Sequence, residues 1–182
     1  MIDNEIMAPP DQPSLDPLGA TALAASASAA TSALADIARE SDQPAMAAQA
    51  EVLRLRVAGV ARVNALRYPR ALAAQETTAS LPDDRRDREI GEAYARAAEP
   101  PLELVCIAAD IAELAAELGR EALAGLQADA AAVASLAAGV ARGAVPLVVV
   151  NLTATPNDDR VAEARQCAER AERAAARAAT AV

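Results

Sequence analysis

The chain has 182 residues, a net charge of −9 and a hydrophobic fraction of 53%, yet only 1% of its residues are aromatic. This length fits one domain with a sizeable core. The acidic balance argues against nucleic acid as a partner, because phosphate binding needs clustered positive charge, and equally against an anionic membrane surface. Histidine is absent, so neither a Ser-His-Asp nor a Cys-His catalytic centre can form.

The alanine-rich composition predicts an all-α fold. Alanine has the highest intrinsic helix propensity, and the β-branched and aromatic residues typical of strands are scarce outside one short run. We expect one domain over residues 18–182, built as a five-helix up-and-down bundle. Because alanine buries little apolar area, a homodimer is expected to add the missing burial. Residues 1–17 are acidic and proline-rich, so we expect a disordered arm, no signal peptide and a cytoplasmic location.

Prolines and short polar sequences divide the chain into helices. The five helices are expected at residues 18–40, 45–79, 83–119, 128–152 and 158–180. Kinks or breaks are expected near Pro69, Pro100-Pro101 and Pro146.

Two of these helices carry clear apolar patterns. The apolar stripe of the second helix comprises Val52, Leu55, Gly59, Val63 and Leu66. The apolar face of the third comprises Leu104, Ile107, Ile111, Leu114 and Leu118. Opposite that face lie four acidic residues, which form either a solvated stripe or, with Asp129, an acidic cleft: Glu103, Asp110, Glu113 and Glu117.

Residues 127–152 form a long apolar run with an acid near its start and an amide near its end. Asp129 is either a first-turn acid stabilised by the helix dipole or a base that binds a cationic substrate. Asn151 is either satisfied by a structural hydrogen bond or orients a substrate. No segment of the chain is expected to be long and uncharged enough to span a membrane.

The second helix carries the other candidate residues. Tyr68 precedes Pro69 between two arginines, and is either a partly exposed aromatic or an acid whose pKa those arginines lower. Arg70, Gln75 and Glu76 follow, as part of either a solvated helix end or a substrate pocket. No metal site is expected. Cys106 and Cys167, which lie far apart and outside any CxxC motif, are expected to be small buried apolar residues.

The second half of the chain resembles the formiminotransferase-cyclodeaminase C-terminal domain and its stand-alone relative, methenyltetrahydrofolate cyclohydrolase. The matching residues are Leu81-Pro82, Pro101-Leu102, Ala112 to Ala115, Asp129, Arg142 to Ala144 and Asn151-Leu152. The resemblance implies a helix-lined pocket at a dimer interface and chemistry at a C=N carbon of tetrahydrofolate.

The departures from the family pattern fall on its functional positions. The Gly-Gly-Gly-Ser start of the family's first helix is replaced at residues 17–21. Tyr68 stands where the family has an aspartate, Ala128 where it has a serine, and Leu147 where it has an inner asparagine.

Three functional hypotheses remain open. The first is a divergent cyclase, deaminase or hydrolase of specialised metabolism. It would act at an imine-like carbon of a small non-folate molecule and need no cofactor, with Tyr68 and Asp129 as catalytic groups. Gln75, Glu76, Arg70 and Asn151 would bind the substrate. The second is a true methenyltetrahydrofolate cyclohydrolase or formiminotetrahydrofolate cyclodeaminase, which would bind a tetrahydrofolate derivative. The third is a non-catalytic helical binding or scaffold protein.

Overall fold

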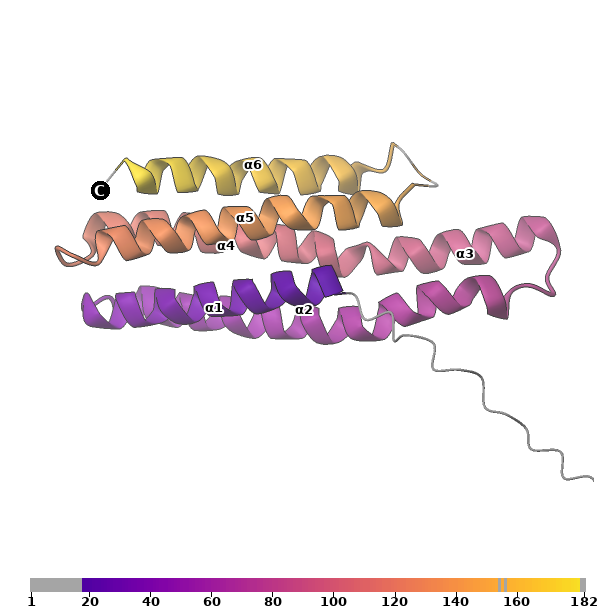
Figure 1. Cartoon of the computed structure of the whole chain (residues 1–182), viewed down its shortest axis with the longest axis horizontal. Helices are drawn as coiled ribbons and strands as arrows, with labels where there is room; N and C mark the ends of the chain where they lie inside the picture. The colour runs from indigo at the N-terminus through magenta and orange to yellow at the C-terminus, as the bar shows by residue number, and fades with distance from the viewer. Residues whose placement is uncertain (1–17, 154, 156, 181–182) are drawn as a thin grey trace, which may run out of the picture.

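The computed structural model describes residues 18–153, 155 and 157–180, and this part of the chain is all-α, as predicted (Figure 1). The expected arm at residues 1–17 lies outside the described residues. The helices are α1 (Leu18–Glu40), α2 (Pro44–Thr77), α3 (Asp83–Ala97), α4 (Glu99–Glu121), α5 (Gln127–Asn151) and α6 (Asp159–Ala179). The predicted five-helix bundle is confirmed, and the expected third helix is divided at Ala98 into α3 and α4.

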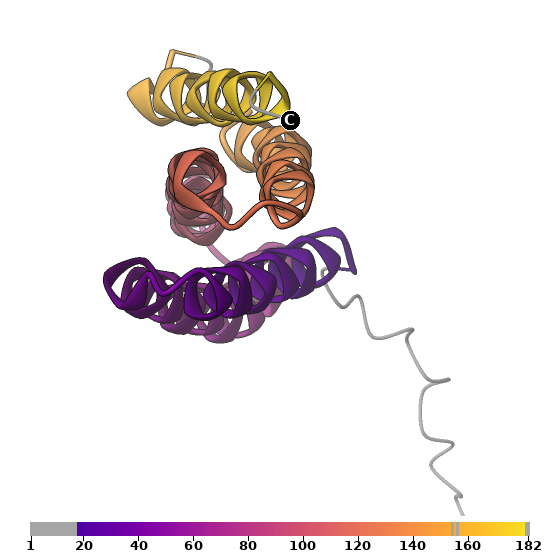
Figure 2. The ribbon, with the colours of Figure 1, turned by 90° about the vertical axis from the view of Figure 1, so that its left-hand side faces the viewer.

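The helices pack in layers. In Figure 2, α1 and α2 form one layer, α4 and α5 lie next to it, and α6 covers α4 and α5 on the far side. Figure 1 shows that α3 and the second half of α2 extend past the end of the bundle as a helical pair. One helix, α2, therefore connects the bundle to this extension.

Prolines are accommodated at three places. Pro100 and Pro101 begin α4, where a missing N–H costs little because the first turn has no intrahelical acceptor for it. In contrast, α2 continues through Pro69 and α5 through Pro146, so each helix loses one internal hydrogen bond. The valine-rich end of α5 is helical, as predicted.

The core centres on α4 and is otherwise largely alanine. The whole predicted apolar face of α4 is buried, with Ile107, Ile111 and Leu118 fully enclosed. Small side chains bring the helix axes close together. At Gly143 on α5, an added Cβ would lie 3.0 Å from the Cδ2 atom of Leu23 on α1. Such spacing leaves little room for larger side chains inside the bundle.

The predicted apolar stripe of α2 does not face this core. Leu53, Val57 and Val60 are the large residues of α2 that are buried, whereas Leu55 and Leu66 are each 59% exposed. The predicted apolar residues do share one side of α2, but that side faces away from the core.

One helix, α5, is long and apolar enough to cross a membrane by length and composition, so the prediction that no segment meets this criterion was wrong. In the fold α5 lies against α1, α4 and α6. Its buried residues include Ala137, Val140 and Ala144. Packing against three helices accounts for the apolar sequence of α5.

The two cysteines form a disulfide between α4 and α6. Cys106 and Cys167 have Cα atoms 5.1 Å apart, within the usual range for a disulfide. Cys167 is buried and Cys106 is partly buried. Treating both only as small buried apolar residues was therefore wrong. Because 61 positions separate them, the pairing depends on tertiary packing and has no local sequence signal.

Candidate functional site

A groove of about 390 Å³ runs between α1 and α2. Its walls are mostly alanine, whose side chains end at Cβ and leave the space between the helices unfilled. Three polar side chains also line it. The lining residues are Ala20, Thr21, Ala24, Ala25 and Ser28 of α1 and Val57, Ala58, Ala61, Asn64 and Ala65 of α2.

Asn64 is the most enclosed polar group of this groove. It is 8% exposed, and its side chain makes no hydrogen bond within the described residues. Among those residues no side-chain polar atom is both fully buried and unpaired, so the amide atoms of Asn64 are still accessible. Its amide therefore reaches the groove, where it can donate to and accept from a ligand. Asn64 was not among the residues predicted from sequence. The available signal was a single amide in an otherwise apolar and arginine-containing stretch, four residues before Tyr68.

Tyr68 lies one helical turn beyond Asn64 on the same side of α2 and is half-buried. The next residue, Pro69, cannot donate to the carbonyl group of Ala65, which lines the groove. A phenol, a buried amide and a backbone carbonyl released from its helical hydrogen bond thus lie along one side of α2.

Asn151 lies at the same end of the bundle as Tyr68. Gly19 at the start of α1 packs near the Leu147 side chain on α5, with 3.9 Å from an added Cβ to Cδ2. Asn151 follows one turn later, is buried, and donates from Nδ2 to the carbonyl oxygen of Leu147 at 2.7 Å. This local bond is the structural role considered for Asn151 from sequence.

Asp129 lies at the opposite end. It is exposed in the first turn of α5, and the 22-residue step to Asn151 corresponds to about 33 Å of helix. The loop before α5 is close to the turn between α1 and α2, because the backbone N–H of Leu123 donates to Oγ of Ser41 at 3.4 Å. One protomer therefore does not bring Asp129 to Tyr68.

Arg70, Gln75 and Glu76 are exposed on the part of α2 that extends beyond the bundle. Of these, Arg70 lines a second hollow of about 640 Å³ between α2 and α3. Two further arginines line it: Arg67, which pairs with Glu99 of α4, and Arg96. Gln75 and Glu76 line neither hollow. Arg70 is only two residues from Tyr68, so the two side chains lie on different sides of α2.

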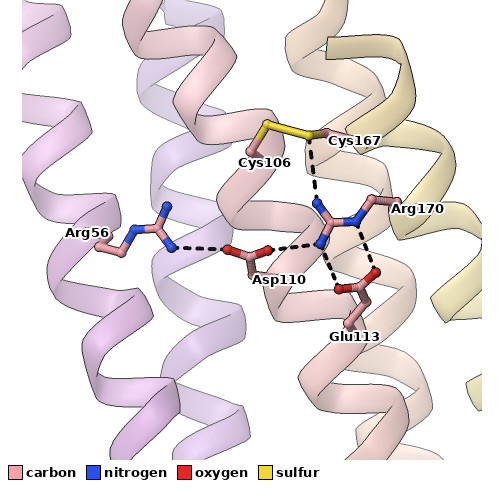
Figure 3. Close-up of a disulfide and its surroundings, with 6 residues drawn as sticks. All are labelled: Arg56, Cys106, Asp110, Glu113, Cys167 and Arg170. Carbon is pink, nitrogen blue, oxygen red and sulfur yellow. Dashed lines mark hydrogen bonds and ion pairs between the residues drawn. A yellow bond between two sulfur atoms is a disulfide. The ribbon is translucent and has the colours of Figure 1, made fainter. Parts of the chain in front are cut away.

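An ion-pair network joins three helices next to the disulfide (Figure 3). Arg170 of α6 donates to Glu113 of α4 at 3.1 and 2.7 Å and to Asp110 at 3.1 Å. Asp110 also accepts from Arg56 of α2 at 3.0 Å. The hydrogen bonds to Glu113 are the main cause that raises the pKa of Arg170.

Half of the predicted acidic stripe therefore takes part in interhelical pairs, and it does not form a cleft with Asp129. Asp110 and Glu113 lie in the network, while Glu103 and Glu117 are exposed. The network holds α2, α4 and α6 together, and Asp110 also lines an apolar hollow of about 390 Å³ between α2 and α4.

Comparison with known proteins identifies the fold and the family. The family model for formiminotransferase-cyclodeaminase matches residues 18–170. The crystal structure of formiminotetrahydrofolate cyclodeaminase from Thermotoga maritima superposes with a TM-score of 0.76 at 17% sequence identity, over 90% of this chain and 86% of that one. No curated protein matches the sequence. Since the family model covers most of the chain, the protein belongs to the formiminotransferase-cyclodeaminase family.

Proposed function

We propose that the protein is a cyclodeaminase- or cyclohydrolase-like enzyme that opens or closes a ring at an imine-like carbon of a small non-folate molecule. The observation that supports this proposal is the buried, unpaired amide of Asn64 in the α1–α2 groove, one turn from Tyr68. An otherwise apolar groove with a few convergent polar groups is typical of a small-molecule site.

In the ring-opening direction, Asn64 holds the substrate by its ring nitrogen or an exocyclic oxygen. Water adds across the C=N bond, so that the carbon takes the hydroxyl group and the nitrogen takes one proton. The bond from this carbon to the departing ring nitrogen then breaks as the hydroxyl group becomes a carbonyl group. The Tyr68 hydroxyl donates its proton to the departing nitrogen and regains the proton that the carbon-bound hydroxyl group loses. Asp129 has no part in this scheme because it lies at the other end of the bundle, and Asn151 supports the end of α5.

A second candidate substrate is a folate. The hollow between α2 and α3 begins just past Tyr68, and Arg67, Arg70 and Arg96 line it. Arginine guanidinium groups bind carboxylates well. Glu89 and Glu92 also line the hollow, and Arg67 and Arg96 pair with Glu99 and Glu92. Arg70, which makes no ion pair within the described residues, is therefore the group that would bind a carboxylate of the glutamate tail of a tetrahydrofolate whose ring system occupies the groove.

Turnover assays distinguish these possibilities. The protein is incubated with methenyltetrahydrofolate, followed by absorbance, and with simple cyclic amidines, followed by NMR. Amidine opening without folate turnover supports the first proposal, and folate turnover supports the second. Binding without turnover of either class would leave only the role of a non-catalytic binding protein.

The matched variants are Tyr68→Phe and Tyr94→Phe, since Tyr94 is the other tyrosine and is also half-buried. We expect the first to lower kcat about 100-fold or more, as removal of a general acid does, and the second to change it little. Equal activity of the two variants would remove Tyr68 from the mechanism.

We also propose a cytoplasmic location. Cell fractionation tests this location, and it should recover the protein with the cytoplasm. Disulfides are rare in that compartment, so thiol alkylation of the acid-quenched fraction is a separate measurement: it should find the Cys106–Cys167 disulfide intact, because Cys167 is buried. Recovery of the protein only from the periplasm or medium would contradict this location.

A further inference from the structure

Pro69 interrupts the hydrogen-bond pattern of α2 beside the α1–α2 groove. A proline inside a helix removes one backbone hydrogen bond and destabilises the helix, yet α2 continues through Pro69 to Thr77. Pro69 is exposed, so the core does not require its ring. The consequence falls on Ala65, whose carbonyl group would accept from the N–H of residue 69 in an uninterrupted helix. Ala65 lines the groove, so this carbonyl group is open to a ligand there.

The freed carbonyl group adjoins the unpaired amide of Asn64. A carbonyl group without its helical donor tilts away from the helix axis, and Ala65 is exposed, so a ligand can reach its oxygen. Asn64 is the preceding residue and also lines the groove. The described residues that line the groove carry no charge, so an anionic group would find no cation to pair with. An acceptor beside an amide instead suits a ligand with an N–H group next to a second polar atom.

Cyclic amidines have this arrangement of polar atoms. Two ring nitrogens flank the carbon that water attacks, and the nitrogen that departs carries a hydrogen when it is not alkylated. That N–H can donate to the carbonyl oxygen of Ala65, while the Asn64 amide, which both donates and accepts, holds the other nitrogen. Hydrogen bonds on either side of the reacting carbon fix the plane of the ring, and such fixed orientation favours reaction.

Tyr68 lies where the departing nitrogen needs a proton. It follows Ala65 by three residues and Asn64 by four, so the three share one side of α2. When the reacting carbon becomes tetrahedral, the departing nitrogen is bonded to two carbons and one hydrogen, and its lone pair takes the fourth direction. Holding the hydrogen at Ala65 therefore fixes the direction of the lone pair, along which Tyr68 donates its proton as the carbon–nitrogen bond breaks.

We propose that Pro69 is a positioning residue, which frees the carbonyl oxygen of Ala65 to accept the N–H of the departing ring nitrogen. The substrate is then a cyclic amidine with a hydrogen on that nitrogen. Rings alkylated there bind more weakly, because the carbonyl oxygen is left without a donor. This inference rests on the proposed function and adds to it the residue that selects among amidines.

Binding of imidazoline and of N-methylimidazoline, measured by NMR titration, tests this selectivity. Both ligands are protonated at neutral pH, so they differ in one N–H group and not in charge. We expect the unaltered protein to bind imidazoline about tenfold more tightly, as one hydrogen bond from a charged group implies. Pro69→Ala restores the N–H that Ala65 lacks. Its affinity for imidazoline should therefore fall about tenfold, while its affinity for N-methylimidazoline changes little.

Pro146→Ala is the matched control. Pro146 also lies inside a helix and is exposed, but the carbonyl group that it frees belongs to Arg142, which does not line the groove. This variant should keep the preference for imidazoline. Both variants should unfold at or above the midpoint of the unaltered protein, because each regains a helical hydrogen bond.

The outcomes separate this inference from the proposed function. Equal binding of the two ligands by the unaltered protein, an unchanged preference in Pro69→Ala, or an equal loss of preference in Pro146→Ala would overturn the inference. If the unaltered protein still opens the imidazoline ring, the proposed function stands without it. Absence of both binding and ring opening in the unaltered protein would overturn the two together.

Discussion

Removal of the Cys106–Cys167 disulfide should destabilise the fold by about 4 kcal/mol. The pair closes a loop of 61 residues, and the chain-entropy relation gives about 14 cal/mol/K for a loop of that length, or about 4 kcal/mol at 25 °C. Typical domains are stable by only about 5–15 kcal/mol. The loss would therefore be a large share of the total stability.

The effect should concentrate on α6. Apart from Cys167, its buried residues are all alanines, and each contributes little apolar area. The disulfide and the Arg170 network therefore carry an unusual share of the attachment of α6 to α4. Without the disulfide, α6 should be the first helix to lose amide protection, because locally weak segments open before the global transition.

Guanidinium unfolding measures the effect, with oxidised protein, reduced protein and the Cys106→Ala/Cys167→Ala variant compared. The variant should match reduced protein and be insensitive to reductant, while hydrogen exchange should show faster exchange in α6 than in α4. A difference below about 1 kcal/mol between oxidised and reduced protein would refute the reasoning, since it is far under the loop-closure value. So would titration of two free thiols in the native chain.

Three further changes test individual contacts. Arg170→Met should lower the free energy of unfolding by about 1 kcal/mol, with a smaller loss at high salt, because its partners are partly exposed. Asp158 caps α6 and its pKa is lowered to about 2 by hydrogen bonds from Arg160. Its ionised form therefore stabilises the fold above pH 3.8, and the cost of Asp158→Ala, about 1 kcal/mol at neutral pH, should fade as pH drops from about 4 to about 2. Thermal unfolding should show a gain of about 0.5–1 kcal/mol for Gly139→Ala, where the added methyl group meets open space. It should show less gain for Gly143→Ala, where a leucine lies 3.0 Å away; equal gains would contradict the packing at Gly143.

The helices could be predicted because their signals are local. Breaks at Pro82 and Pro100 and the strong 3.6-residue pattern from Leu104 to Leu118 were sufficient to place α3 and α4. The effect of Pro69 and Pro146 was harder to predict. A proline inside a helix destabilises it, and whether the helix continues depends on tertiary packing that the local sequence does not show. The valine-rich end of α5 was correctly predicted as helix from the family resemblance.

The site was less predictable because it depends on contacts between helices. Tyr68 stood out as a rare residue at a proline, but Asn64 became significant only once the alanines of α1 and α2 were seen to leave a groove beside it. Asp129 and Asn151 stood out at the ends of one apolar run. The length of α5 alone separates them by about 33 Å, which the sequence pattern already implied.

The position of the predicted apolar stripe of α2 shows how an alanine-rich bundle changes the meaning of hydrophobic periodicity. In most helices the largest aliphatic residues mark the buried side. Here, close helix axes admit mainly alanine and a few valines or leucines on the side of α2 that faces the core, as at Ala47 and Ala50. Large residues such as Leu55 and Leu66 that point outward have no role in that core. In a bundle of this composition, a stripe of bulky apolar residues can therefore mark an exposed side of a helix, and the small residues between them mark the side that faces the core.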